Sequence, residues 1–331
     1  MRICVFGAGA IGGLMAARLA RTDADVSVVA RGAHLEAIRG HGLTLVGTDG
    51  VRDTVAVAAA ENPSDLGPQD VVILTLKAHQ IPAAVPAIRV LLGEGTAIVH
   101  AVNGIPWWYF HRHGGPLNGK RLAAVDPGDA QWSGLGPARM IGCVVYPAAE
   151  VVQPGVVRHI DGVRFSVGEP SGDQTDRVSA VSRALTEAGF RAPVRPRIRD
   201  EIWLKLWGNL SFNPLSVLTH ATLEQLAGFP GTRAIARAMM VEAQAIAEKL
   251  GVRFPVDVDR RIAGAEAVGA HRTSMLQDLD HGRSMEIDAL VTVVQELGRL
   301  TDTPTPTIDT VLALTQLRAG TAGLYQSAGP A

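Results

Sequence analysis

A lysine and two asparagines on one predicted helix have the types and the spacing of a catalytic row. Lys205, Asn209 and Asn213 follow one another at intervals of four, so their side chains share one face of a helix. A lysine ammonium can stabilise negative charge on an oxygen and deliver a proton, and asparagine amides both donate and accept hydrogen bonds. Because asparagine is a poor helix former, this alignment favours a binding or catalytic face. Solvent exposure or helix capping is the alternative interpretation.

The N-terminus carries a second chemical pattern, which is typical of a dinucleotide site. The apolar run Arg2–Phe6 leads directly into Gly7-Ala8-Gly9-Ala10-Ile11-Gly12, here called the glycine turn. Glycines at these positions permit a tight turn, close approach of a pyrophosphate, and close packing of the following helix on the strand. The N-terminus of that helix then faces the anion.

Arg31 indicates which dinucleotide is bound. It follows the second predicted strand, at the position where an NAD-preferring site usually carries an acidic residue. A guanidinium pairs with a 2'-phosphate through charge-assisted hydrogen bonds, so Arg31 favours NADP(H). The alternative is an exposed surface arginine without a ligand.

The elements that must position these residues fall into two parts. Residues 1–197 alternate Val/Ile-rich runs with helical stretches, whereas the pattern beyond is helical. The predicted strands are Ile3–Phe6, Val26–Val29, Leu43–Val46, Val71–Leu76, Ala97–Ala101, Arg139–Val145 and Val163–Val167. Pro193 and Pro196 predict a linker over 191–197, and the tail from Gly320 is expected to fray.

The predicted fold class is therefore α/β. An N-terminal Rossmann-like, NADP-binding domain spans 1–197 and an all-helical substrate or catalytic domain spans 198–331. We expect the substrate in the cleft between them, at the carboxyl ends of the strands.

Composition argues against several classes of partner. The 331 residues carry a net charge of -1, so no global positive field favours nucleic acid or an anionic membrane surface. No apolar run reaches the length of a membrane span, and no signal peptide precedes the first strand. Cys4 and Cys143 lack metal-ligand spacing, and His111 and His113 lack metal-binding neighbours, so no metal site is predicted. These features predict a cytoplasmic protein that binds a small molecule.

Five segments in order resemble the ketopantoate reductase (2-dehydropantoate 2-reductase) family, over nearly the whole chain. They are the glycine turn, Leu74–Gln80, Val102–Gly104, the helix containing Lys205 to Pro214, and Ser274–Asp278 with Glu286–Asp288. The resemblance implies a 6-phosphogluconate dehydrogenase-like architecture. It also implies NADPH-dependent reduction of ketopantoate to pantoate, on the route to pantothenate and coenzyme A.

The same resemblance implies roles for the substrate-side residues. Lys205 matches the general acid, which suits a ketone oxygen that gains negative charge. Asn209 and Asn213 match substrate-contacting asparagines, Ser274 matches the serine that binds the substrate carboxylate, and Glu286 matches the glutamate that accepts the substrate hydroxyl. A helix-start acid without a ligand is the alternative for Glu286. Because Ser274 and Glu286 would lie about 18 Å apart along one continuous helix, Gly282 is expected to break it.

Further positions are implied on the cofactor side. Asn103 matches the asparagine that holds the nicotinamide side and the catalytic lysine in register. Lys77 matches a lysine near the cofactor, although a surface role is an equal interpretation. Ala148 is counted among the cofactor-binding positions together with Arg31 and the glycine turn.

The chain departs from the family pattern in three places, one of which is that a further substrate-side asparagine of some relatives is not evident after Leu215. Residues 105–137 form an insertion that begins with four consecutive aromatics, Trp107 to Phe110, which could form a hydrophobic wall or lid. Packing on the domain core or on a partner subunit is the alternative. Val144–Ala148 stands where many relatives have a Thr-Thr-His strand end. These changes leave the substrate's identity open.

Three hypotheses follow. The first is an NADPH-dependent ketopantoate reductase, the second is a reductase of a different 2-oxo acid, and the third is a non-catalytic, NADPH-binding regulatory protein. The helical domain could support a homodimer, although the sequence shows no decisive interface.

Overall fold

The computed structural model describes residues 1–325, which form two compact units. The first unit comprises Met1–Val102, Pro106–Arg121 and Asp126–Ile198. The second comprises Asn103–Ile105, Leu122–Val125 and the chain from Arg199 onward. Two short segments from the N-terminal part of the sequence therefore belong to the helical unit, and one of them begins with Asn103.

The first unit is built on a seven-stranded sheet with β1 among its inner strands. In sheet order the strands are β11 (Phe165–Gly168), β8 (Met140–Val145), β7 (Leu92–His100), β6 (Gln69–Leu74), β1 (Arg2–Phe6), β2 (Asp25–Val29) and β5 (Ala58–Ala60). All neighbours pair in parallel except β11, which is antiparallel to β8. Strand order reverses beside β1, which is where such sheets bind ligands at their carboxyl ends.

A second sheet of four strands belongs to the same unit. Its order is β4 (Arg52–Val55), β3 (Leu43–Val46), β10 (Val156–Asp161) and β9 (Ala148–Gln153). The strand predicted at Leu43–Val46 is present as β3 and belongs to this second sheet, whereas strands β4, β5, β9 and β10 were not predicted. Short strands with exposed residues lack the buried apolar run that identified the others.

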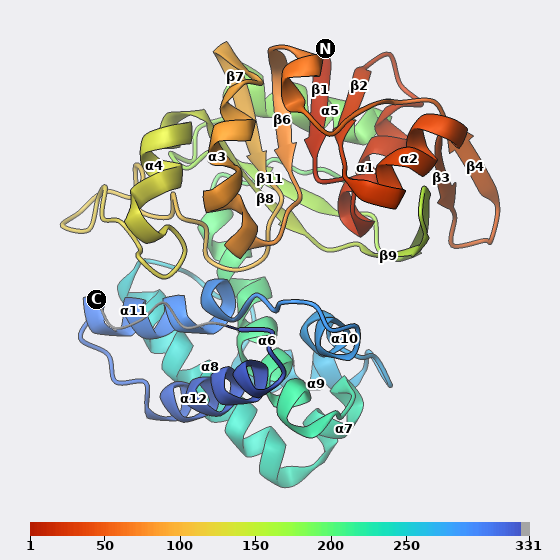
Figure 1. The fold of residues 1–331 in the computed structure, drawn as a ribbon. Helices are drawn as coiled ribbons and strands as arrows, with labels where there is room; N and C mark the ends of the chain where they lie inside the picture. Colours follow the sequence, from red (N-terminus) through yellow and green to blue (C-terminus); the bar gives the residue numbers. More distant parts are fainter. Residues whose placement is uncertain (326–331) are drawn as a thin grey trace. The chain divides into compact units, whose positions relative to one another are not determined.

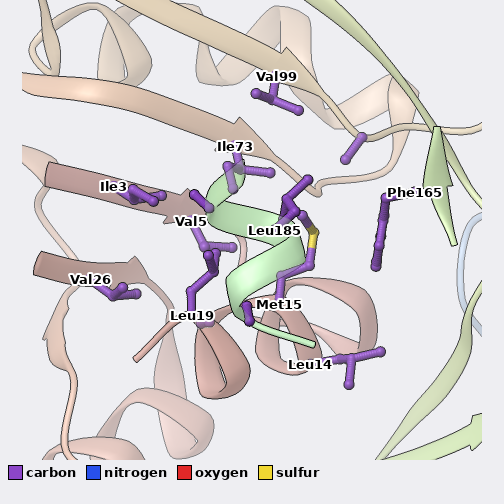
Figure 2. Packing of buried hydrophobic residues seen from close by; sticks show 14 of the residues in the cluster. Ile3, Val5, Leu14, Met15, Leu19, Val26, Ile73, Val99, Phe165 and Leu185 are labelled. Carbon is purple, nitrogen blue, oxygen red and sulfur yellow. The ribbon is translucent and has the colours of Figure 1, made fainter. Parts of the chain in front are cut away.

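Helices cover the main sheet and bury its apolar side chains. The helices of this unit are α1 (Ala10–Leu19), α2 (Gly32–His41), α3 (Ile81–Arg89), α4 (Ala130–Leu135) and α5 (Asp176–Glu187). Figure 2 shows Met15 and Leu19 of α1 and Leu185 of α5 gathered near Val5 and Ile73 of the sheet, and Leu14 belongs to the same buried cluster. This packing fixes the direction in which α1 leaves the glycine turn.

The segment predicted as a linker is instead part of the first unit. Arg191 bridges to Arg164 and Val194 to Val167, both in parallel, so the chain lies along the sheet edge beside β11. Phe190 and Ala192 are buried there. The two prolines interrupted the strand pattern without releasing the segment from the core.

The second unit is helical. Figure 1 shows its helices as the coiled ribbons coloured from green to blue. Its helices are α6 (Ile198–Thr219), α7 (Leu223–Gly228), α8 (Pro230–Lys249), α9 (Val258–Glu266), α10 (Ser274–Asp280), α11 (Val293–Leu300) and α12 (Pro306–Thr321). A π-helical turn over Asp288–Thr292 precedes α11. The fold class predicted from the sequence, a Rossmann-like α/β domain followed by a helical domain, is confirmed.

The predicted fraying of the tail is wrong for the residues described. α12 continues through Thr321, and the Leu324 amide donates to the carbonyl of Ala319. The Tyr325 hydroxyl hydrogen-bonds to Asp288. The rest of the predicted fraying tail lies outside the described residues.

Candidate active site

The glycine turn has the geometry of a cradle for a pyrophosphate. Gly7 has φ +108°, a conformation that side-chain-bearing residues rarely adopt. A Cβ on Gly12 would lie 2.0 Å from the Gly7 carbonyl oxygen, whereas a Cβ on Gly9 would meet nothing within 4 Å. The turn is therefore packed tightly behind Gly12 and open at Gly9, the N-cap of α1.

These residues fit a dinucleotide. The first amides of a helix have no partners within it, and no side chain caps α1. An anion at this end is favoured by those donors and by the helix dipole. Thr75, which the sequence analysis gave no role, donates its hydroxyl to the Gly7 carbonyl at 2.6 Å and so fixes the turn. Its place directly after β6 was the available signal.

Arg31, predicted to bind the 2'-phosphate, lies in the first unit near the end of β2. It is the N-cap of α2, separated from β2 by Ala30 alone, and its side chain is exposed. Among residues 1–325 its guanidinium makes no intramolecular hydrogen bond or ion pair. The assignment to a phosphate stays a prediction.

Lys77 and Ala148 occupy less decisive places. Lys77 follows β6, is half-buried, and its amide donates to the Gln80 side chain. Ala148 is the first residue of β9, and that strand packs against α1. Both lie in the nucleotide unit, and a direct role for either in cofactor binding stays a prediction.

In the helical unit, α6 carries the predicted row of Lys205, Asn209 and Asn213. The helix is anchored by Trp203 and Trp207, both fully buried, so the opposite face is fixed in the core. Lys205 and Asn209 are half-buried, whereas Asn213 is only 4% exposed. The row therefore lies along a sheltered face of the helix.

Asn103 joins Lys205 to Glu286. The Lys205 Nζ donates to Asn103 Oδ1 at 2.6 Å, and Asn103 Nδ2 donates to Glu286 Oε2 at 3.2 Å. Because an amide presents its oxygen to a cation and its nitrogen to a carboxylate, the two bonds fix the orientation of the Asn103 side chain. The structure thus brings together three residues that lie at positions 103, 205 and 286 of the sequence.

Asn213 contributes a buried donor with no protein acceptor. Its Nδ2 makes no hydrogen bond among the residues that the structure describes. A buried amide group without a partner is unfavourable by about 1–3 kcal/mol, so such a group is expected to find a ligand atom or a water. The orphaned donor suits a substrate-contacting asparagine.

Ser274 begins α10, and the preceding residue, Thr273, connects that helix to α6 through buried hydroxyls. Ser216 Oγ donates to the Asn213 carbonyl at 2.7 Å and lies 2.5 Å from Thr273 Oγ1. Thr273, the N-cap of α10, also accepts from the Leu276 amide. Ser274 itself is exposed. The predicted break between Ser274 and Glu286 is present, since α10 ends at Asp280 and Gly282 has φ +63°.

The aromatic insertion belongs to the core rather than to a lid. Trp107, Trp108, Tyr109 and Phe110 are each at most 1% exposed. Trp108 packs edge-on against His100, with ring centroids 6.3 Å apart. The wall-or-lid interpretation is therefore wrong, and packing on the core of the first unit is correct.

The chemistry available from cysteines and metals is limited. Both cysteines are free and buried, and burial raises the pKa of the Cys4 thiol to about 12, so it is an inert thiol at neutral pH. No group of three or more metal-ligating residues occurs among residues 1–325. In that same range, no helix is both apolar and long enough to span a bilayer.

Comparison with known proteins decides the family. The sequence pattern described as "Ketopantoate reductase PanE/ApbA" matches residues 3–172, and the pattern described as "Ketopantoate reductase PanE/ApbA C terminal" matches residues 197–319. The chain belongs to the ketopantoate reductase family. It is accordingly an oxidoreductase, and the predicted cofactor, NADPH, is the one that this family uses.

Individual relatives agree with this assignment. A 2-dehydropantoate 2-reductase of Mesorhizobium japonicum is 59% identical over 326 residues, covering 98% of this chain and all of the relative. The solved structure of a Ralstonia solanacearum protein assigned as a ketopantoate reductase is 42% identical, with TM-score 0.93 over 98% of this chain and 99% of the other. D-mandelate dehydrogenase, solved with NADH and anilino(oxo)acetate, shares the fold with TM-score 0.83 at 20% identity over 98% of this chain and all of the other. The fold by itself therefore does not identify the acid.

Proposed function

We propose that this protein reduces 2-dehydropantoate (ketopantoate) to pantoate with NADPH, and that Lys205 is the general acid. The observation that carries the proposal is the hydrogen-bonded group Lys205–Asn103–Glu286 in the helical unit. The 59% identical 2-dehydropantoate 2-reductase supports it. The product belongs to the route to pantothenate and coenzyme A.

NADPH, when bound, supplies the hydride for the carbonyl carbon of the substrate. The glycine turn would hold its pyrophosphate and Arg31 its 2'-phosphate. As the carbonyl π electrons move to oxygen, the Lys205 ammonium stabilises the developing negative charge and transfers a proton from Nζ to that oxygen. The neutral amine then recovers a proton from water.

The other residues bind and orient the substrate. Asn103 keeps the Lys205 ammonium in place through its carbonyl oxygen. Glu286 accepts a hydrogen bond from the substrate hydroxyl, while Asn209, Asn213 and Ser274 contact its polar groups. Asn213 offers a donor that the protein leaves unsatisfied.

A panel of 2-oxo acids tests the proposal by the loss of NADPH absorbance. Ketopantoate should give the highest kcat/KM, and 3,3-dimethyl-2-oxobutanoate, which lacks only its hydroxyl, should give a value at least tenfold lower. Glu286→Gln should narrow that gap, because the carboxylate is the acceptor for the hydroxyl. Preference for a bulkier acid would favour the second hypothesis, and no turnover with any acid would favour a regulatory protein.

We also propose that the helical unit forms a homodimer. An apolar hollow of about 430 Å³ lies between α6, α8 and α12, lined by residues that include Leu215, Ile235 and Leu314. Leu314 and Leu317 on α12 are 51% and 66% exposed, so burying them against a second copy would be favourable. A ketopantoate reductase of Staphylococcus aureus with this fold is dimeric (19% identity, TM-score 0.73).

Sedimentation velocity at micromolar concentrations tests the dimer. The protein should sediment as a dimer, and Leu317→Glu should shift it toward the monomer. A parent protein that is monomeric at all concentrations would overturn the proposal.

Two buried free thiols suit a reducing compartment, and we assign the enzyme to the cytoplasm on that ground.

A further inference from the structure

The C-terminal segment of the described chain is tied to the helical unit by a tyrosine. After α12 the chain turns back, with the Leu324 amide on the Ala319 carbonyl. The Tyr325 hydroxyl then donates to Asp288 Oδ1 at 2.9 Å and accepts from Gln316 Nε2 at 3.0 Å. The hydroxyl is therefore satisfied in both of its hydrogen-bonding roles.

Asp288 is held from a second side as well. Thr292 Oγ1 donates to the same carboxylate oxygen at 2.7 Å. Burial, and next the negative charge of Asp288, raise the pKa of Tyr325 to about 12. At neutral pH the phenol keeps its proton, as an ordinary tyrosine does, and donates a hydrogen bond to the carboxylate.

Asp288 begins the π-helical turn Asp288–Thr292, and this turn contacts the segments that carry two of the site residues. The Leu290 amide donates to the Glu286 carbonyl at 3.2 Å, and the Ile105 amide donates to the Ala289 carbonyl at 3.0 Å. Gly104 has φ +89°, and a Cβ there would lie 2.1 Å from the Ala289 oxygen. The backbone next to Asn103 thus lies directly on the π-helical turn.

The turn is a shared support for Glu286 and Asn103. Any displacement of its backbone would alter the 3.2 Å hydrogen bond between these two side chains, and through Asn103 the place of the Lys205 ammonium. Single π-helical turns inside helices occur frequently at functional sites. Buried Ala289, Leu290 and Val291 hold its apolar side, and the hydrogen bonds of Thr292 and Tyr325 to Asp288 hold its first residue.

We infer that Tyr325 is a positioning residue for reduction, acting through Asp288 and the π-helical turn to hold Glu286 and Asn103 in register. The inference rests on the proposed function. Tyr325 lies beyond residues 197–319, the part that matches the C-terminal family pattern, so its role is not supplied by the family assignment.

The test compares Tyr325→Phe with Thr321→Val. Tyr325→Phe removes one hydroxyl from the hydrogen bonds to Asp288 and keeps the ring. Thr321→Val, the control, removes one hydroxyl near the end of α12 that donates to the Arg318 carbonyl and not to Asp288. Thr292→Val removes the other donor to Asp288 and should act in the same direction as Tyr325→Phe. Each variant is assayed for kcat, KM, NADPH affinity and amide hydrogen exchange in peptides covering 103–105 and 286–292.

Tyr325→Phe is expected to lower kcat about tenfold with NADPH affinity unchanged, and to accelerate exchange in both peptides. Thr321→Val should change neither. Unchanged exchange in Tyr325→Phe, or faster exchange with unchanged kcat, would overturn the inference, as would an equal effect of Thr321→Val. If the parent reduces no 2-oxo acid, the proposed function fails separately, and the exchange measurement alone decides whether Tyr325 holds the turn.

Discussion

The candidate ligand sites of the two units are built from different parts of the chain, backbone in one and side chains in the other. In the nucleotide unit the ligand-facing feature is backbone: Gly9 is open, Gly12 is packed against the Gly7 carbonyl, and no side chain caps α1. In the helical unit it is a set of side chains, Lys205, Asn103 and Glu286, that the fold brings together from distant positions. A site made of backbone requires small residues such as glycine, whereas a site made of side chains requires neighbouring groups that fix the position of each side chain.

This difference predicts which property a substitution in each unit should reduce, cofactor binding or the rate of reaction. Adding a methyl group at Gly12 should weaken cofactor binding strongly, because the Gly7 carbonyl leaves no room for it. Truncating the Lys205 side chain should leave NADPH bound and slow the reaction. The following changes, taken from the largest expected effect to the smallest, test this separation.

Lys205→Ala should lower kcat about 10³-fold, the usual size of a general-acid contribution combined with loss of charge stabilisation. NADPH affinity, measured by fluorescence titration, should remain within twofold of the parent because the cofactor cradle lies in the other unit. A proportional loss of NADPH affinity would make Lys205 a structural residue and would break the comparison.

Gly12→Ala should weaken NADPH binding about 100-fold, because a Cβ 2.0 Å from the Gly7 oxygen must displace backbone at a cost of about 3 kcal/mol. Gly40→Ala is the matched control, since Gly40 lies in α2 outside the glycine turn and its Cβ would meet no atom within 4 Å in the protein. Binding is measured by titration and folding by urea denaturation. Equal effects of the two substitutions on a folded protein would show that the cradle has been misidentified.

Arg31→Ala should weaken NADPH about ten- to hundredfold, the value of charge-assisted hydrogen bonds to a phosphate, and leave NADH affinity nearly unchanged. The ratio of the two dissociation constants is the measurement. A parallel loss for both cofactors would contradict the phosphate assignment.

Mild acid should destabilise the nucleotide unit through His100. Burial lowers the pKa of this histidine from 6.5 to about 4, so between these values the unfolded chain binds more protons and stability falls as pH drops. The expected loss from pH 7 to pH 5 is about 2 kcal/mol. The histidines of the helical unit, His220, His271 and His281, are exposed.

His100→Phe keeps a ring against Trp108 and removes the titration. Urea denaturation at pH 7 and pH 5 should therefore show a smaller pH dependence for this variant than for the parent. The same loss in both proteins would mean that other groups cause the acid sensitivity.

The sequence predicted elements better than it predicted their neighbours. The glycine turn could be predicted from the sequence because all its residues are contiguous. The strand at Leu43–Val46 was correct, yet a run of alternating apolar residues does not say which sheet it joins. Trp107 to Phe110 were ambiguous between lid and core because both places accept aromatic residues, and only packing distinguishes them.

In the candidate site, the sequence indicated Lys205, Asn103 and Glu286, which the structure brings together, but not the contacts that support them. The intervals within α6 indicated a polar face, and Asn103 was expected near Lys205 on the basis of family resemblance. Its assignment to the helical unit depends on the backbone contact of Gly104 and Ile105 with Ala289, which leaves no periodic signal. Tyr325 was missed because it stands in a tail of small residues that suggested fraying.

Rescue of Lys205→Ala by added ethylamine tests the central claim most directly. With NADPH and ketopantoate both saturating, a single turnover of the variant should accelerate as ethylamine is added, and at fixed total amine the rate should follow the ethylammonium concentration as pH varies. That result would assign proton delivery to the missing ammonium. A folded variant that binds NADPH as the parent does, yet is accelerated by no amine, would contradict the account.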